Sequence, residues 1–156
     1  MGWVGHLLIA VWRDTPDTMV GMFRDEARRG IAERGMGLGH MPVVLAGCPP
    51  MSLEARRGLL AVARENRKSM NVFVPVVSPT GFLAGAVRAA GELIFMMLPG
   101  SQYRLKIASD VAEAARFLMT TMPDNDPRLT AGCLAGAVAA LEERLADGAR
   151  GVTTTP

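Results

Sequence analysis

Aromatic side chains are scarce in this chain of 156 residues, and its charges are nearly balanced. Aromatic residues make up 5% of the sequence, and the 17 basic residues are interspersed with 15 acidic ones. A nucleic-acid surface needs Lys and Arg clustered on one face, together with aromatic side chains on which bases stack. We therefore expect no nucleic-acid partner.

Cysteine and uninterrupted apolar sequence are also rare. The longest apolar region covers residues 82–98, but Arg88 and Glu92 interrupt it, so no membrane span is expected. Residues 1–14 lack the basic start of a signal peptide. The expected location is therefore the reducing cytoplasm, where the two cysteines, Cys48 and Cys133, would remain free thiols.

The chain does contain an alternation of strand-like and helix-like segments. Short apolar runs predict strands over residues 7–12, 42–48, 71–77 and 102–108. Helical spacing of apolar residues after Ser, Thr, Asp or Pro predicts helices that begin near Pro16, Ser52, Thr80, Asp110 and Asp126. The pattern is typical of an α/β fold. We predict a small, mostly parallel or mixed sheet of about four to five strands, with helices packed mainly on one face and a C-terminal helical extension.

A glycine-rich stretch and a single proline interrupt this pattern. Residues 35–42 hold three glycines, but they follow a helix and precede a strand, which is the reverse of the order in a dinucleotide-binding loop. We interpret them as a flexible connection, and we expect no cofactor. Pro75 predicts an edge position or an irregularity within its strand.

Two helix starts have capping signals. Ser52 is expected to cap the helix that runs to about Lys68, with Leu53 on its buried face. Asp110 and Glu113 form a capping-box pattern at the start of a later helix.

Cys48 lies between a strand and a helix, where the positive end of the helix dipole can activate a thiol. An oxyanion site at such a cysteine needs backbone N–H groups, but Pro49 and Pro50 have none. We interpret Cys48 as a buried packing residue. The two histidines, His6 and His40, lack a third ligand at a recognised spacing, so we interpret them as solvated or hydrogen-bonded and expect no metal. No catalytic residue is predicted.

The third helix, over residues 81–98, would be apolar except for a narrow charged stripe. On a monomer, such a helix would expose a large apolar surface. It is therefore either enclosed by the C-terminal helix or used as a subunit contact, and the second case predicts a symmetric dimer. The expected interaction surface consists of Arg56, Phe82, Arg88, Glu92 and Phe95.

Three short motifs occur in the order of the predicted elements. They are a Pro-x-x-x-x-x-Arg pattern at 50–56, a Gly-Phe pair with a following Arg at 81–88, and a strand that leads into Asp110-x-x-Glu113-Ala114. Together they resemble a STAS-like (SpoIIAA-like) domain of an uncharacterised bacterial branch. The resemblance covers roughly residues 5–120. It divides the chain into a STAS-like α/β domain over residues 1–122, a C-terminal helix over 123–149 packed on the same domain, and a flexible tail over 150–156.

The resemblance implies a regulatory role. Known roles of the family include anti-anti-sigma factors, sensor scaffolds and regulatory domains of transporters. In anti-anti-sigma factors, a phosphorylatable serine lies at a helix start within an Asp-Ser-Ser/Thr-Gly motif. Ser52 occupies that place and is the candidate for phosphorylation or switching, although the Asp and Gly of the motif are absent here.

These observations favour a non-enzymatic regulatory or protein-interaction domain. Its partner would be another protein or a second copy of the chain in a homodimer. One alternative is a small-molecule or lipid-binding protein with an apolar cleft beside the third helix. A further alternative is a thiol-dependent enzyme that uses Cys48.

Overall fold

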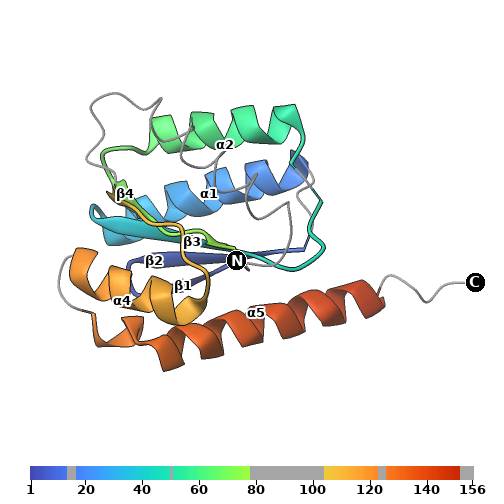
Figure 1. Cartoon of the computed structure of the whole chain (residues 1–156). Coiled ribbons are helices and arrows are strands. Elements are labelled where there is room, and N and C mark those ends of the chain that lie inside the picture. The colour runs from blue at the N-terminus through green and yellow to red at the C-terminus, as the bar shows by residue number, and fades with distance from the viewer. Residues whose placement is uncertain (14–16, 50, 78–103, 123–125, 152–156) are drawn as a thin grey trace, which may run out of the picture.

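A six-stranded sheet runs through the molecule, in the order β1-β2-β3-β4-β6, with β5 paired to β3. The computed structural model describes residues 1–13, 17–49, 51–77, 104–122 and 126–151 (Figure 1). β1 is antiparallel to β2, and the other pairs are parallel. The predicted class, an α/β fold with a mixed sheet and a C-terminal helix, is confirmed. The strands are β1 (Gly2–Val4), β2 (Leu7–Trp12), β3 (Leu38–Val44), β4 (Met70–Phe73), β5 (Val76–Val77) and β6 (Arg104–Leu105).

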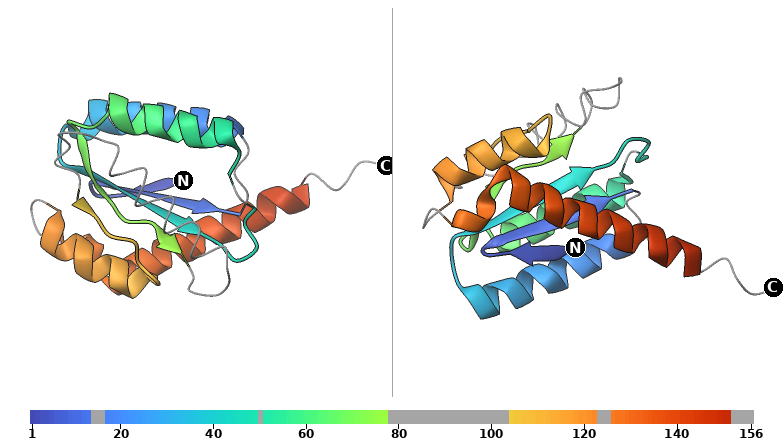
Figure 2. Two further views of the ribbon diagram at one scale, coloured as in Figure 1. Left: turned by 45° about the horizontal axis from the view of Figure 1, so that its top comes forward. Right: turned by 90° about the horizontal axis from the view of Figure 1, so that it is seen from below.

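Helices cover both faces of the sheet (Figures 1 and 2). Helices α1 (Asp17–Arg34) and α2 (Leu53–Glu65) lie on one face, while α4 (Val111–Thr121) and α5 (Ala131–Gly151) lie on the other. β2, β3 and β4 follow one another across the sheet in one direction, so crossovers of the same hand place α1 and α2 on the same face. The structure thus differs from the expectation of helices mainly on one face.

Residues 38–42 of the glycine-rich stretch are part of the central strand, which corrects the prediction that all of residues 35–42 form a connection. β3 begins at Leu38 and pairs with β2 along its length. A Cβ atom at Gly39 would lie 2.9 Å from the sulfur of Met122 and 3.0 Å from a methyl of Leu7. Glycine at position 39 therefore lets β3 pack closely against Met122 at the end of α4. The residues next to Gly39 in the sequence do not reveal this close packing.

Two further strand details bear on the predictions. β1 was not predicted; it forms a hairpin with β2 in which Val4 pairs with Leu7 and Gly5 has φ of 56°. Pro75 separates β4 from β5 and accepts a hydrogen bond of 2.9 Å from the N–H of Ala108. The predicted irregularity at Pro75 is confirmed.

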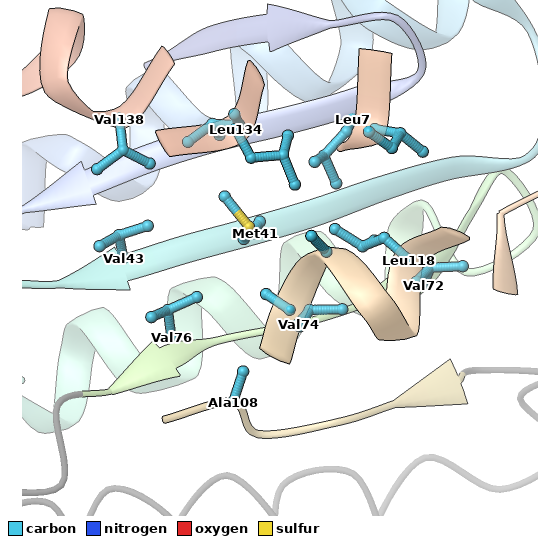
Figure 3. Close-up of a cluster of buried hydrophobic side chains, with 14 of the residues drawn as sticks. Leu7, Met41, Val43, Val72, Val74, Val76, Ala108, Leu118, Leu134 and Val138 are labelled. Atoms are coloured by element: carbon cyan, nitrogen blue, oxygen red, sulfur yellow. The ribbon is translucent and has the colours of Figure 1, made fainter. Parts of the chain in front are cut away.

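The larger core lies between the sheet and the pair α4 and α5 (Figure 3). Alternate residues of β2 and β3, such as Leu7 and Met41, meet Leu118 of α4 and Leu134 of α5 there. Each large apolar side chain buried in this way contributes about 1.5–3 kcal/mol. The C-terminal helix therefore shares the core of the sheet.

The smaller core lies under α1 and α2. Its buried residues are Leu8, Phe23, Ala27, Leu38, Val62 and Met70. Because Leu7 and Leu8 face opposite cores, β2 is buried on both sides, as its uninterrupted apolar sequence indicates.

The helix ends match the capping signals in part. The side chain of Asp110 accepts from the N–H of Glu113 at 2.7 Å, so the predicted cap of α4 is confirmed. Asp126 caps a short 3-10 helix, η2 (Pro127–Leu129), and α5 begins only at Ala131. Since α5 continues to Gly151, residues 150 and 151 belong to the helix and not to the predicted tail.

Candidate functional site

The connection from β3 to α2 forms a tight turn at the carboxyl edge of the parallel strands. Gly47 has φ of 82°, a value that residues with a side chain rarely adopt. The N–H of Cys48 bonds the carbonyl of Leu45 at 3.2 Å, which closes the turn. In open α/β sheets this edge is where ligands and partners commonly bind.

Cys48 is a packing residue in this turn. Its side chain is 5% exposed, and its sulfur lies 3.7 Å from the carbonyl oxygen of Pro49. The prediction that Cys48 is buried is therefore confirmed. Neither Cys48 nor Cys133 forms a disulfide in the described part of the chain, as predicted.

Ser52 caps α2, as predicted. Its exposed hydroxyl accepts a hydrogen bond of 2.9 Å from the N–H of Ala55. Arg56 folds back over this helix start, because its Nε donates to the carbonyl of Met51 at 3.1 Å. The structure thus brings together two residues that the sequence proposed for separate roles, Ser52 as a switch and Arg56 as part of an interaction surface.

Leu53 follows the cap and is 62% exposed, which corrects the prediction that it faces inward. The buried residues of α2 are Ala55 and Val62. Once Val62 is known to be buried, helical spacing places Ala55 on the same side of α2 and Leu53 on the outer side. Leu53 is a functional candidate that the sequence reasoning missed.

The two ends of α2 differ in how their charges are neutralised. Near its last turn, Glu65 lies 3.7 Å from both Arg24 and Arg28 of α1. At its start, Arg56 and Arg57 are exposed, and neither pairs with a carboxylate among the described residues. We call the exposed residues Ser52, Leu53, Arg56 and Arg57 the α2 start surface.

The other members of the predicted interaction surface are Phe82, Arg88, Glu92 and Phe95. They lie outside the described residues, as do the predicted third helix and the cleft beside it. The part of the predicted surface that the structure describes is therefore Arg56.

His40 is neither solvated nor hydrogen-bonded at Nε2, which corrects its interpretation from the sequence. It is 5% exposed on β3, and Nε2 is buried without a hydrogen-bond partner in the described part of the chain. Its ring stacks on Phe23 of α1 at 4.3 Å and lies 5.2 Å from the ring of Phe73. Burial lowers the pKa of His40 to about 3, so the imidazole is neutral at neutral pH.

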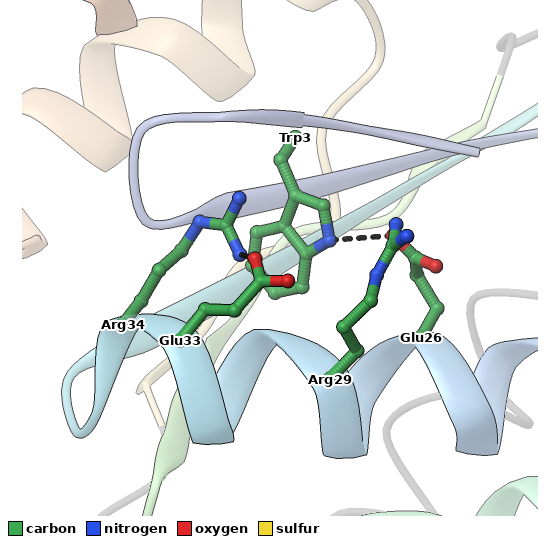
Figure 4. Close-up of polar contacts among 5 residues, drawn as sticks. All are labelled: Trp3, Glu26, Arg29, Glu33 and Arg34. Carbon is green, nitrogen blue, oxygen red and sulfur yellow. Dashed lines mark hydrogen bonds and ion pairs between the residues drawn. The ribbon is translucent and has the colours of Figure 1, made fainter.

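A polar cluster joins β1 to α1 (Figure 4). The indole N–H of Trp3 donates to a carboxylate oxygen of Glu26 at 2.7 Å, and Arg29 pairs with the same oxygen. The guanidinium of Arg34 lies 4.5 Å from the centre of the Trp3 ring and pairs with Glu33. These groups satisfy one another, so the cluster attaches the edge strand to the helix.

Within the described ranges, no group of three or more His, Cys, Asp or Glu residues is placed to hold a metal ion. In the same part of the chain, no helix combines the length and the apolar character needed to cross a membrane. Comparison of the chain with protein-family models, with curated proteins and with solved structures finds no match.

Proposed function

We propose that this chain is a non-enzymatic regulatory or protein-interaction domain and that it binds its partner through the α2 start surface. The observation that carries the proposal is the exposed Leu53 beside Arg56 and Arg57, two cations without a described carboxylate partner. Binding hot spots often combine an apolar anchor with arginine. The complementary surface would offer an apolar pocket bordered by Asp or Glu side chains.

The position of Ser52 supports a regulatory role for the same surface. A phosphate on this hydroxyl would stand at the positive end of the α2 dipole, one turn from the guanidinium of Arg56. It would also reverse the charge next to Leu53, and a partner that bears carboxylates would then be repelled. The resemblance to STAS-like domains assigns a switch to this serine and supports the same proposal.

Charge reversal at the two ends of α2 tests the proposal. Arg56 and Arg64 are both exposed on this helix, so Arg56→Glu and Arg64→Glu are matched variants. We expect wild-type protein and Arg64→Glu to capture the same protein from a lysate of the native host. Arg56→Glu should capture at least about tenfold less of it, because one charged contact at an interface contributes more than about 1.4 kcal/mol.

A second matched pair separates apolar contact from charge. Leu53→Ser removes the apolar anchor, while Met22→Ser makes a similar change at a residue of α1 that is 58% exposed. Loss of capture with Leu53→Ser alone supports the α2 start surface. Equal capture by all four variants, or equal loss in all four, contradicts it.

The location and self-association of the chain remain predictions. We propose a cytoplasmic location, and the thiol state of Cys48 and Cys133 is the observation that supports it. We also propose that a second copy of the chain is one partner, and sedimentation velocity of purified protein over a range of concentrations tests this. A monomer at every concentration contradicts the homodimer but leaves binding to a different protein intact.

A further inference from the structure

His40 is a buried titratable side chain that the proposed function does not use. It lies on the central strand, and the residues in register with it on the two neighbouring strands are Leu8 and Phe73. From α1, Phe23 stacks on the imidazole at 4.3 Å. The ring therefore lies in an apolar contact between the sheet and the layer formed by α1 and α2.

Among the described residues, no group in this contact compensates a charge on the imidazole. Nε2 is buried and has no hydrogen-bond partner among the described residues. In the described part of the chain, the charged groups that pair across α1 and α2 are Arg24 and Arg28, which both lie 3.7 Å from Glu65. β2 and β4 place apolar side chains beside the ring.

Protonation would therefore conflict with the packing. An imidazolium carries N–H donors on both ring nitrogens, and here the one at Nε2 would be a buried, charged donor without an acceptor. Burial of such a group is strongly unfavourable. The ring can accept a proton only where water reaches it, and this requires α1 to separate from the sheet.

We propose that His40 is a proton-sensitive latch, which holds α1 and α2 on the sheet at neutral pH and releases them in mild acid. α4 and α5 pack on the opposite face through a separate core and remain in place. This proposal does not depend on the α2 start surface. It concerns how α1 and α2 are attached to the sheet, whereas the α2 start surface concerns which partner the chain binds.

The direction of the pH effect follows from the protonation states. The pKa of His40 is about 3 in the closed state and would return to about 6.5 once the ring is hydrated. Between these values the open state binds one more proton than the closed state. Lowering the pH through this window therefore favours opening, by up to about tenfold in the opening equilibrium for each pH unit.

Hydrogen exchange of the full chain between pH 7 and pH 4, corrected for intrinsic rates, tests the latch. In wild-type protein we expect protection of α1 and α2 amides to fall about tenfold per pH unit below pH 6, while α5 amides keep their protection. His40→Phe should abolish this loss. His6→Gln, a change at the histidine of the β1–β2 turn, should leave it unchanged.

Two outcomes would overturn the proposal. One is an equal loss of α1 protection in wild type and in His40→Phe, and the other is a simultaneous loss from α1 and α5 in wild type. If His40→Phe does not fold, His40→Leu takes its place. The wild-type ring also gives a direct answer by NMR, because titration near pH 6.5 with α1 amides still protected contradicts the latch.

Discussion

The indole N–H of Trp3 bonds a carboxylate oxygen of Glu26 across 2.7 Å, and this contact fastens strand β1 to helix α1. β1 spans Gly2–Val4 and pairs with β2 alone, so its own ladder supplies few hydrogen bonds. The ring also packs under Arg34 and over Gly30. The attachment of the edge strand therefore depends on side chains of α1.

We predict that Glu26→Ala lowers the free energy of unfolding by about 1–2 kcal/mol, because it leaves the partly buried indole N–H without its charged acceptor. Urea unfolding followed by tryptophan fluorescence measures the change. Glu33→Ala is the control, since Glu33 pairs with Arg34 at the surface and its loss should change the free energy by less than about 0.5 kcal/mol. Equal effects of the two substitutions would show that the bond to Trp3 contributes nothing.

We expect a change of glycine to alanine to have opposite effects on the free energy of unfolding at two positions of α1, Gly21 and Gly30. Glycine within a helix is less stable than alanine by about 1 kcal/mol, so Gly21→Ala should stabilise the protein, because open space surrounds Gly21. A Cβ atom at Gly30 would overlap the ring of Trp3, so Gly30→Ala should lower the free energy of unfolding by about 1–3 kcal/mol. Thermal unfolding of both variants checks the pair. A stabilising Gly30→Ala would contradict the close packing of Trp3 on α1.

The features that local sequence specifies were predictable. Ser52 and Asp110 cap their helices because a short polar side chain reaches an N–H three residues later, and this geometry needs no distant partner. Pro75 interrupts its strand because it has no N–H to donate. In each case the cause lies within a few residues of the effect.

The features that depend on distant residues were not predictable. Gly39 and His40 read as part of a loop because residues 35–42 hold three glycines and a proline, yet β2 and β4 enclose them on both sides. For the candidate site, Ser52 and Arg56 could be chosen from the sequence, but the bond that turns the Arg56 side chain back to the carbonyl of Met51 could not. The exposure of Leu53 depends on which side of α2 meets Val20 of α1, and this is fixed only by tertiary packing.

The cap of α2 gives a prediction that is separate from partner binding. Ser52→Ala removes the acceptor for the N–H of Ala55 and should lower the free energy of unfolding by about 1 kcal/mol. Ser52→Asp should retain nearly wild-type stability, because aspartate also caps helices well. Ser69→Ala is the control, since the hydroxyl of Ser69 makes only a 3.7 Å contact with the sulfur of Met36. A destabilised Ser52→Asp would contradict the capping role.

At the start of α4, the contacts of Glu113 predict a lowered pKa that can be measured at this one carboxyl group. Lys106 lies 2.8 Å from one carboxylate oxygen of Glu113, and the N–H and hydroxyl of Ser109 each donate to the other at 2.8 Å. These contacts lower the pKa of Glu113 from 4.5 to about 2, with Lys106 as the largest cause.

Because the folded-state pKa is the lower one, the contribution of Glu113 to stability is complete above the ordinary pKa of 4.5. It is lost as the pH falls through about 2. We expect Lys106→Met to raise the pKa of Glu113, as measured by carbon NMR of its carboxyl group between pH 1.5 and pH 6. Arg104→Gln is the control, because Arg104 lies in β6, just before Lys106, but contacts the carbonyl of Thr121 instead. An unchanged pKa in Lys106→Met would mean that the ion pair does not persist in solution and that Ser109 alone holds the carboxylate ionised.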